Sequence, residues 1–396
     1  MKTTLDCPIK MLCKTEEVAD STVEVCIVKS ISDVNDADWN GFVMENKGLL
    51  NTNYLFAAET ANPHIKFRYA SIYANAELIA VCLFQVIEIT NGLRIKKGKS
   101  DSFQDWAKTN TKKFINGLSL KLLLNGNAFI TGDFGYCLKK TADKSQYLAG
   151  LHQAITAIDK EENLNIIMIK DFRPEDIAWG QELTKYSFKE VGAQPNMEFD
   201  VKWDTFEEYL AALSSKYRVK VKSKLKKGKG LVKKELTLEE VEEQYVKIHQ
   251  LYKRISDNAE FNLTFLTAEY FLECKRQLGD DFHIKGYYID GELVAFMSYF
   301  IVNGKMESHF VGYEAKFNNK YAIYHNLLAE HIAIAIEKKL TFISFGRTAL
   351  ESKSNFGAKG VHLNSFVYSK NMVLQALSTK LFDSMKTEFI ERHPFK

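Results

Sequence analysis

Two stretches of this chain repeat one pattern of residues at a constant offset. Residues 288–296 read YIDGELVAF and residues 73–81 read YANAELIAV, so the turn pair Asp290–Gly291 corresponds to Asn75–Ala76. Each pair lies between residues that favour β-strands, which predicts two strands joined by a two-residue turn. Because a repeated local pattern marks a repeated structural unit, the chain is predicted to contain the same fold twice.

The elements that follow each hairpin occur in the same order, namely a strand, a helix and a second strand. In the first copy they are NAFITGDFGY (127–136), a helix from Ser145 and NIIMIKDF (165–172), and in the second they are KMESHFVGY (305–313), a helix from Tyr321 and LTFISFG (340–346). A strand–helix–strand unit joins parallel strands, whereas the hairpin is antiparallel. We therefore expect an α/β protein with two tandem domains, residues 1–199 and 200–396, each a mixed central sheet flanked by helices.

The overall composition is that of a globular protein. The 396 residues carry a net charge of only +3, so an anion-binding site must come from a local cluster of charge. No GxGxxG or GxxxxGK[ST] motif is present, which argues against dinucleotide and P-loop chemistry. The six cysteines form no CxxC pair, and no spacing of His, Cys and Asp indicates a metal, so we expect reduced thiols.

The N-terminus shows no signal-peptide pattern, and the longest apolar run, ELIAVCLFQVIEI (77–89), is too short to span a bilayer. We expect a cytoplasmic protein, with contact to a membrane surface left open.

A lysine-rich run, KYRVKVKSKLKKGKGLVKK (216–234), contains ten basic residues and no acid. Its first half alternates basic and other residues, as in a strand, but its apolar residues also continue a helical stripe that begins at Phe206. We favour a helix that is capped by Asp204 or Thr205 and ends near Gly228. The run is interpreted either as a solvated face or as an anion site.

Three stretches of the second half carry a resemblance to a known family: WDTFEEYLAALSSKYRVKVKSKLKKGKG (203–230), YYIDGELVAFMSYFIVNG (287–304) and FGRTALESKSNFGAKG (345–360). They resemble the GNAT acyltransferase superfamily, and the tandem arrangement resembles its double-domain Fem-like branch and the related bacterial peptidoglycan-biosynthesis GNAT proteins. The resemblance implies an N-acyltransferase that moves an acyl group from acyl-CoA or an acyl-carrier protein to a primary amine, such as that of a lipid or cell-envelope precursor. It implies no tightly bound cofactor.

Two alternatives stay open. One is aminoacyl-tRNA-dependent transfer for peptidoglycan, as in Fem-like proteins, and the other is a non-catalytic GNAT-like binding module. The N-terminal domain is expected to be a degenerate copy, because AFITGDFGY (128–136) lacks a Glu and His pair.

In this family the thioester lies between two splayed parallel strands, which would here be 305–313 and 340–346. Strand alternation places Glu307, His309 and Tyr313 on one face. We expect His309 to be the general base for the amine, with Glu307 orienting or replacing it. Tyr313 either protonates the departing thiolate or only packs. A packed core histidine is the alternative for His309. No nucleophile motif such as GxSxG is present, which favours direct attack by the amine.

The phosphates of the donor are expected beside the helix that follows residue 313. The chain there reads AKFNNKYAIYHN (315–326) and lacks the glycines of the family signature Q/R-x-x-G-x-G/A. Asn318, Asn319 and Lys320 are therefore the predicted donors to phosphate. The missing glycines argue against coenzyme A bound in the standard way, and they are compatible with a carrier-protein donor or with a donor held differently.

Further predicted contacts with the donor come from two other segments. Arg347 and Lys353 follow the strand 340–346, where they could contact a phosphate or carboxylate, or pair with Glu351 instead. Arg218 and Lys222 belong to the lysine-rich run, whose candidate partners are the phosphates of coenzyme A, an acidic carrier protein, anionic lipid and tRNA. Of these, tRNA is the less favoured, because the run offers few aromatic rings for stacking on bases.

Overall fold

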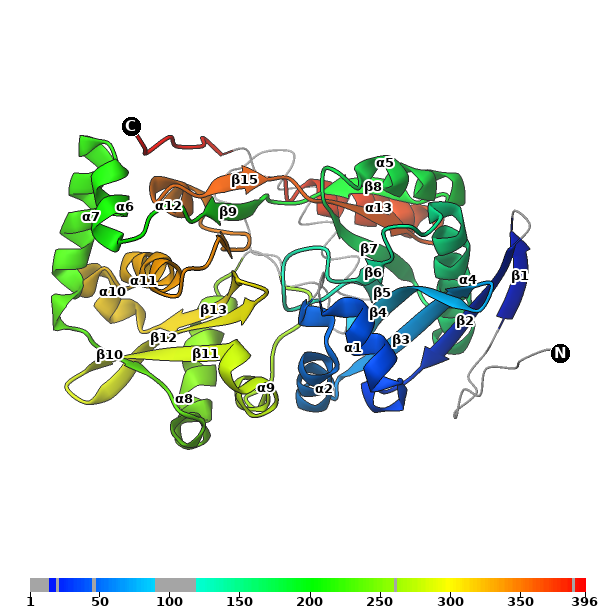
Figure 1. Cartoon of the computed structure of the whole chain (residues 1–396), viewed down its shortest axis with the longest axis horizontal. Helices are drawn as coiled ribbons and strands as arrows, with labels where there is room; N and C mark the ends of the chain where they lie inside the picture. The colour runs from blue at the N-terminus through cyan, green and yellow to red at the C-terminus, as the bar shows by residue number, and fades with distance from the viewer. Residues whose placement is uncertain (1–13, 19–20, 45–47, 90–118, 260–261, 387–388) are drawn as a thin grey trace. The chain divides into compact units, whose positions relative to one another are not determined.

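The chain separates into two compact units (Figure 1), and the computed structural model describes residues 14–18, 21–44, 48–89, 119–259, 262–386 and 389–396. Unit 1 consists of Met1–Ala193 together with Leu363–Met385, and unit 2 consists of Gln194–His362 together with Lys386–Lys396. The expected division lay after residue 199, and it assigned residues 363–385 to the second domain. The chain therefore leaves unit 1, builds most of unit 2, and then returns to unit 1.

Unit 1 is a mixed α/β unit. Its elements are β1 (Lys14–Val18), β2 (Ser21–Val28), η1 (Ile31–Asp33), α1 (Asp36–Val43), η2 (Gly48–Leu50), α2 (Thr52–Ala61), β3 (Ile65–Ala74), β4 (Glu77–Ile89), β5 (Leu120–Asn125), β6 (Tyr136–Leu138), α4 (Lys144–Glu162), β7 (Ile166–Phe172), α5 (Ile177–Gly180), η3 (Gln181–Tyr186), β8 (Lys189–Gly192), β16 (Asn364–Tyr368) and α13 (Met372–Asp383). The sheet runs β1-β2-β3-β4-β5-β7-β16-β8, with β6 on β4. Strands β5 and β7 pair in parallel, and the other pairs within the described residues are antiparallel.

The helix predicted from Ser145 is confirmed as α4. The side chain of Asp143 accepts a hydrogen bond from the Ser145 N–H and so caps the first turn. The apolar stripe of the helix, which includes Tyr147, Leu151 and Ile158, packs on one face of the sheet.

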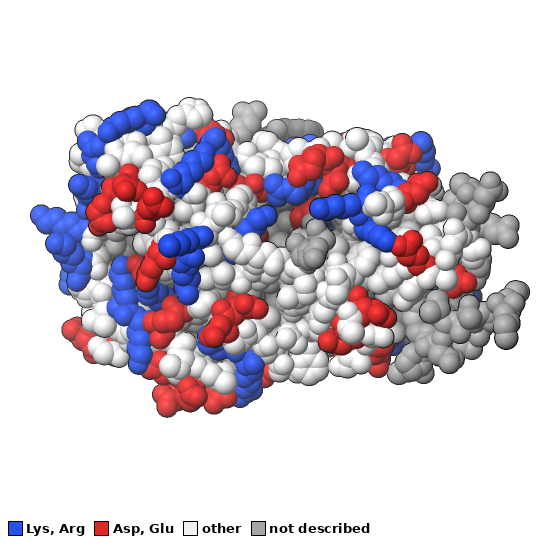
Figure 2. Space-filling view, in the orientation of Figure 1, with Lys and Arg blue, Asp and Glu red and all other residues white. Residues whose placement is uncertain are grey.

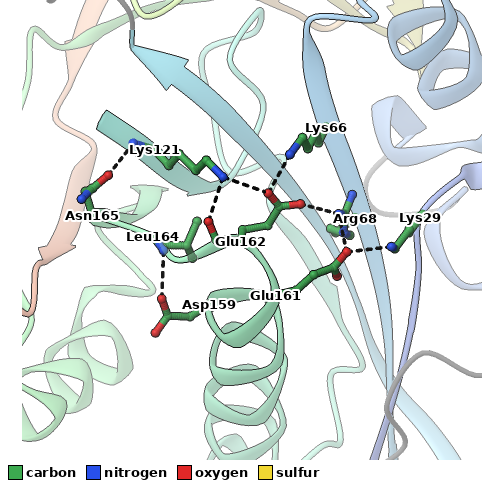
Figure 3. Close-up of polar contacts among 9 residues, drawn as sticks. All are labelled: Lys29, Lys66, Arg68, Lys121, Asp159, Glu161, Glu162, Leu164 and Asn165. Carbon is green, nitrogen blue, oxygen red and sulfur yellow. Dashed lines mark hydrogen bonds and ion pairs between the residues drawn. The ribbon is translucent and has the colours of Figure 1, made fainter. Parts of the chain in front are cut away.

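A cluster of charges fixes the end of α4 to the sheet (Figure 3). The carboxylate of Glu162 accepts hydrogen bonds from Lys66 at 2.8 Å and Arg68 at 2.6 Å, and it lies 3.6 Å from the ammonium of Lys121. Burial raises the pKa of Glu162, but these three cations outweigh it and hold the pKa below its usual value. Because all three cations come from strands of the sheet, the cluster is an anchor within unit 1.

Unit 2 has the same class of architecture. Its elements are β9 (Asn196–Asp200), α6 (Phe206–Ala212), α7 (Ser215–Lys227), η4 (Gly228–Gly230), β10 (Val232–Glu235), α8 (Leu238–Ser256), α9 (Tyr270–Leu278), η5 (Gly279–Asp281), β11 (Phe282–Ile289), β12 (Glu292–Val302), β13 (Lys305–Tyr313), α10 (Ala315–Tyr321), α11 (Ile323–Glu337), β14 (Phe342–Ser344), α12 (Leu350–Asn355) and β15 (Lys359–Val361). The sheet runs β10-β11-β12-β13-β14-β9-β15, and β13 and β14 pair in parallel. Two mixed sheets flanked by helices confirm the predicted fold class.

The helices of unit 2 cover both faces of its sheet. On one face, α6, α7 and α11 share a core with Met306 of β13. On the other face, α8 and α9 lie against β13, where the ring of Tyr252 is 5.0 Å from that of Phe310. The two faces of β13 are therefore referred to below as the α11 face and the α8–α9 face.

The repeated hairpin is confirmed in both units, down to its irregularities. Strands β3 and β4 turn at Asn75 and Ala76, and β11 and β12 turn at Asp290 and Gly291, with positive φ angles at all four residues. Positive φ at both central positions is the geometry of a type I′ turn. In each hairpin the register shifts at the same place, before Tyr73 in one and before Tyr288 in the other.

The strand predicted at residues 127–136 is wrong. Strand β5 ends at Asn125, and residues 126–135 form an irregular segment with positive φ at Gly126 and Gly132. Phe129 and Ile130 are nevertheless buried, which explains the strand-like pattern of the sequence. Burial of apolar side chains in a loop imitates a strand when the pattern is short.

Residues 216–227 of the lysine-rich run are helical, as predicted, but this helix does not continue the one that begins at Phe206, and residues 232–234 belong to β10. Thr205 caps α6, which ends at Ala212, and α7 starts afresh at Ser215. Leu213 and Ser214 between them have extended backbone, and Leu213 forms a β-bridge with Phe395. The apolar stripe assigned to one helix is thus shared by two.

The two turns give a reciprocal test of backbone strain. We expect Ala76→Gly to raise the free energy of unfolding by about 1 kcal/mol, because Ala76 holds φ at 67° and glycine adopts such angles without a steric penalty. Gly291→Ala should lower it by a similar amount, since a methyl group there would meet no atom within 4 Å and only the backbone is strained. Urea unfolding measures both, and a change of the same sign in the two variants would contradict this account.

Candidate functional site

The parallel pairing between β13 and β14 is short. It comprises the pairs Lys305–Phe342, Met306–Ile343 and Glu307–Ser344, and no further pair forms between these strands within the described residues. Beyond Ser344 the chain stays hydrogen-bonded to Met197 of β9 through the Phe345 N–H and the Gly346 carbonyl, and Gly346 has a φ of 69°. Residues 308–313 of β13 therefore continue along the sheet without β14 beside them.

A β-bulge lies in the part of β13 that has β12 beside it but not β14. Met297 of β12 is opposite Val311, but Tyr299 is opposite Ser308, so β13 contains an extra residue between these pairs. The hydroxyl of Ser298 fills the gap, accepting a hydrogen bond from the Phe310 N–H at 3.1 Å and donating one to the Phe310 carbonyl at 3.1 Å.

Glu307, His309 and Tyr313 do not share one face, contrary to the prediction, because the bulge lies between His309 and Tyr313. His309 lies on the α8–α9 face, where its ring is 5.5 Å from that of Tyr270. Tyr313 lies on the α11 face, where its ring is 6.4 Å from that of Tyr324. Alternation holds only while the ladder is regular, and one extra residue reverses the faces of all that follow.

The position of His309 fits a general base poorly. Its Nδ1 lies 3.2 Å from the Ser298 hydroxyl and its Nε2 lies 3.3 Å from the Tyr270 hydroxyl, so both ring nitrogens have partners. Aromatic rings, including those of Phe282 and Phe300, surround the imidazole. Burial lowers the pKa of His309 to about 3, so the ring is neutral and a weak base.

Glu307 is placed at the end of the parallel ladder. Met306 faces α11, so Glu307 projects to the α8–α9 face, opposite Phe300 of β12. It is partly exposed. Tyr313 is also partly exposed, and burial raises its pKa, so its hydroxyl stays protonated.

A hydrogen-bonded Ser–His pair, absent from the sequence-based expectations, lies at the same point on the α11 face. Ser308 is the first residue of β13 beyond the ladder, and its hydroxyl is 3.1 Å from Nε2 of His331 in α11. Nδ1 of His331 is 2.8 Å from the Leu327 carbonyl. No motif links residues 23 positions apart in a strand and a helix, so no local signal could have revealed the pair.

The start of α11 differs from the predicted phosphate site, in which Asn318, Asn319 and Lys320 donate hydrogen bonds to phosphate. Residues 315–321 form the short helix α10, and the side-chain oxygen of Asn318 accepts a hydrogen bond from the Tyr324 N–H at 3.1 Å. Asn318 is thus an acceptor that uses one of the first N–H groups of α11. Asn319 and Lys320 are exposed, and the Lys320 ammonium lies 4.9 Å from the centre of the Tyr321 ring.

The segment after β14 is held in an unusual conformation by Lys353. Thr348 and Ala349 have φ angles of 68° and 48°, which are strained for residues with a side chain. The buried ammonium of Lys353 donates to three carbonyls, those of Phe345 at 2.8 Å, Gly346 at 3.1 Å and Arg347 at 2.6 Å.

Lys353 is predicted from the sequence to contact a ligand, and in the structure its three donors are all used within the protein. Burial lowers the pKa of Lys353 to about 7, and the three carbonyls favour its protonated form in return. Arg347 is partly exposed, and its Nε donates to the Gln194 carbonyl at 2.9 Å. Glu351 pairs with Arg392.

The basic helix α7 is fixed beside the start of α11. The side-chain amide of Asn326 donates to the Lys224 carbonyl at 3.0 Å, and a Cβ on Gly228 would lie only 2.3 Å from the same side chain. Arg218 donates to the carbonyls of Ala211 and Leu213, so it stabilises the end of α6. Lys222 is exposed.

The corresponding place in unit 1 is filled by its own chain. Beyond the parallel pair β5–β7, the irregular segment 126–135 is bound by buried side chains of the sheet. Lys170 donates to the Ile130 carbonyl at 2.7 Å, Asp171 accepts from the Gly132 N–H at 2.9 Å, and Gln85 accepts from the Ala128 N–H at 2.8 Å.

Three general features complete the description. Among the described residues, Cys26, Cys82, Cys137 and Cys274 form no disulfide, and Cys7 and Cys13 lie outside the described part of the chain. The described residues hold no group of three His, Cys, Asp or Glu side chains that could bind a metal ion. In the same part of the chain, none of the helices combines the length and apolar character needed to cross a bilayer.

Comparison with known families identifies the class of the second unit. Residues 215–354 match the family described as Acetyltransferase (GNAT) domain, and this match spans α7 through all but the last residue of α12. No curated protein matches the chain.

Solved structures show the same fold over most of the chain. FemX is 14% identical with a TM-score of 0.56, over 87% of this chain and 98% of FemX. A tandem GNAT protein from the clavulanic acid biosynthesis pathway is 8% identical with a TM-score of 0.51, over 88% of this chain and 99% of that one. A conserved protein of unknown function from Bacteroides thetaiotaomicron is 10% identical with a TM-score of 0.50, over 91% of this chain and the whole of that one.

These comparisons confirm the resemblance predicted from the sequence. Unit 2 contains a GNAT acetyltransferase domain, and the chain has the double-domain fold of tandem GNAT and Fem-like proteins. The matching part of unit 2, residues 215–354, is a GNAT-type transferase domain.

Removing the Lys353 ammonium should destabilise unit 2. We expect Lys353→Met to lower the free energy of unfolding by about 2–4 kcal/mol, because it leaves three carbonyls without their donor. Lys359→Met is the matched control, since Lys359 is exposed and its loss should change stability by less than about 0.5 kcal/mol. Equal effects in urea unfolding would show that the buried hydrogen bonds contribute little.

Proposed function

We propose that this chain is an N-acyltransferase that carries an acyl group from a thioester to a primary amine at the end of the β13–β14 ladder. The observation that carries this proposal is the separation of the two strands after Glu307 and Ser344, combined with the bulge in β13. Strand edges that lack a partner offer backbone N–H groups, and such groups can polarise a thioester carbonyl. Unit 1 has segment 126–135 at the corresponding place, so we assign the activity to unit 2.

The amine must lose a proton when it attacks the carbonyl, and we assign the role of proton acceptor to Glu307. Its carboxylate lies at the end of the ladder, and it is partly exposed on the α8–α9 face. His309 has both nitrogens occupied and a pKa of about 3, so we give it a packing role instead. Tyr313 keeps its proton and is the proposed source of the proton for the departing thiolate.

A comparison of two variants tests this assignment. Glu307→Gln should lower kcat by about 100-fold or more, as expected for loss of a general base, whereas His309→Gln should lower it by less than about 10-fold. Hydroxylamine serves as the amine and a lauroyl thioester as the donor, with hydroxamate formation as the signal. The reverse order of the two effects would return the role of base to His309.

The donor we favour is an acyl group on a small acidic carrier protein. In α7 and η4, six lysines are exposed and no carboxylate of the described residues forms an ion pair with them: Lys216, Lys220, Lys222, Lys226, Lys227 and Lys229. Figure 2 shows Lys and Arg side chains gathered at the left of the view, where Figure 1 draws α7. An unpaired cluster of this size attracts an anionic surface.

Two details favour a protein over a free nucleotide or RNA. Val219 is 63% exposed and lies between Lys216 and Lys222 on one face of α7, which suits a partner with both acidic and apolar side chains. Asn318 uses an N–H at the start of α11, so the usual helix-terminus site for a pyrophosphate is weakened. The arrangement therefore supports a donor recognised through its protein surface.

Charge reversal on α7 tests the choice of donor. We expect the triple variant Lys222→Glu, Lys226→Glu and Lys227→Glu to weaken binding of lauroyl-loaded acyl carrier protein by at least about 10-fold at low salt, and less at high salt. The control reverses three exposed lysines elsewhere in unit 2, Lys338, Lys339 and Lys359. Turnover of lauroyl-pantetheine, which lacks a carrier surface, should be unchanged in both variants.

Binding of other donors, measured over the same range of salt concentrations, distinguishes the alternative donors. Tight binding of lauroyl-CoA that α7 does not influence would make coenzyme A the donor. Binding of unfractionated tRNA alone, with log affinity falling steeply against log salt, would favour Fem-like aminoacyl transfer.

A further inference from the structure

A chain of hydrogen bonds runs from helix α9 to the bulge of β13. Tyr270, the first residue of α9, places its hydroxyl 3.3 Å from Nε2 of His309, and Nδ1 of the same ring lies 3.2 Å from the hydroxyl of Ser298. That hydroxyl in turn contacts the backbone N–H and the carbonyl of Phe310, each at 3.1 Å. Tyr270 and Ser298 are fully buried, so bulk water does not compete for these contacts.

The Phe310 carbonyl fixes the direction of the hydrogen bonds at the bulge. The bulge leaves Phe310 outside the β12–β13 pairing, and its carbonyl can only accept, so it receives the single hydrogen of the Ser298 hydroxyl. The Ser298 oxygen then has only electron pairs to offer. One of them accepts from the Phe310 N–H, so Nδ1 of His309 can bond to the other only by donating a hydrogen of its own.

The other nitrogen of His309 follows from the charge of the ring. Burial lowers the pKa of His309 to about 3, so the ring is neutral near pH 7 and carries one hydrogen. With that hydrogen on Nδ1, Nε2 has a free electron pair and accepts from the Tyr270 hydroxyl. Each member of the chain therefore donates in one direction, from α9 toward the bulge. A histidine side chain free in water prefers the opposite tautomer, with the hydrogen on Nε2.

We propose that His309 is a positioning residue, which carries its hydrogen on Nδ1, joins α9 to the bulge of β13 and so holds the strand where the thioester carbonyl is polarised. This inference rests on the proposed function. It goes beyond the packing role given to the ring above, because a ring that only packs would fit equally well with its hydrogen on either nitrogen. The effect of His309 on the reaction passes through Ser298 and the backbone of Phe310.

The bulge lies between the two side chains to which proton transfer is assigned. Glu307 precedes it in β13 and Tyr313 follows it, so a loosened bulge changes the distance between the proton acceptor and the proton source. Acyl transfer depends on the placement of both groups relative to the thioester. Loss of the Nδ1 donor should therefore lower kcat and leave the KM for the amine unchanged.

Two amide side chains distinguish the two ring nitrogens. The amide nitrogen of asparagine occupies about the position of Nδ1, and that of glutamine occupies about the position of Nε2. We expect His309→Gln to lower kcat about 5-fold, as for the loss of one hydrogen bond, and His309→Asn to lower it less than about 2-fold. Hydroxamate formation from lauroyl-pantetheine and hydroxylamine measures both. Equal kcat in the two variants would overturn the positioning role.

The tautomer is tested without any substrate. Nitrogen-15 NMR of the full chain with labelled histidine distinguishes ring nitrogens that carry hydrogen from those that do not, and the signals lost in His309→Asn are those of His309. We expect hydrogen on Nδ1 in the wild type. Ser298→Ala removes the acceptor of that hydrogen, so the ring should shift to the tautomer with hydrogen on Nε2. Hydrogen on Nε2 in the wild type would contradict the inference.

A second histidine of the same sheet provides the control. His283 lies in β11 and bonds to Glu235, so His283→Gln should leave both the kcat and the ring signals of His309 unchanged. Circular dichroism melting of every variant establishes that each chain is folded.

The two measurements separate the failure of this inference from that of the proposed function. Hydroxamate formation by a wild type that carries hydrogen on Nε2 would overturn the inference and leave acyl transfer standing. A wild type that carries hydrogen on Nδ1 but forms no hydroxamate would overturn the proposed function, and the role of His309 in the reaction would fall with it.

Discussion

The hydrogen bonds between the Ser298 side chain and the backbone of Phe310 stabilise the bulge of β13, on which the rest of the site depends. They pair a partly buried N–H and carbonyl that the bulge removes from the β12–β13 ladder, and leaving a fully buried group unpaired costs about 1–3 kcal/mol. With the bulge in place, Glu307 and Tyr313 lie on opposite faces of the sheet. A regular strand would put both side chains on one face.

Much of the fold could be predicted because its signals are local. The type I′ turn at Asp290–Gly291 follows from a residue pair that tolerates positive φ, and the turn at Asn75–Ala76 follows from its correspondence with that pair. The amphipathic helices and β-branched strands follow from their periods. The repetition of hairpin, strand, helix and strand then gave the class of fold before any contact was known. The helix formed by the lysine-rich run could also be predicted, since its apolar residues keep a helical spacing.

The site was harder to predict from the sequence. Its features join residues that are distant in sequence, or they depend on the one extra residue of the bulge. Ser308 meets His331 across a strand and a helix, and Lys353 turns inward to carbonyls that no pattern marks. The bulge reversed the face predicted for Tyr313. In unit 1, residues 126–135 carry a strand-like apolar pattern, yet side chains such as those of Gln85 and Asp171 bind their backbone.

The position of β16 in the sheet of unit 1 has a consequence for synthesis of the chain. Strand β16 pairs with both β7 and β8, but it follows the whole of Gln194–His362 in the sequence. As the ribosome delivers the chain from its N-terminus, β7 and β8 must wait without their common neighbour until unit 2 has emerged. Unpaired strand edges invite wrong pairing, so the order of synthesis exposes the first unit to misfolding while the second is being made.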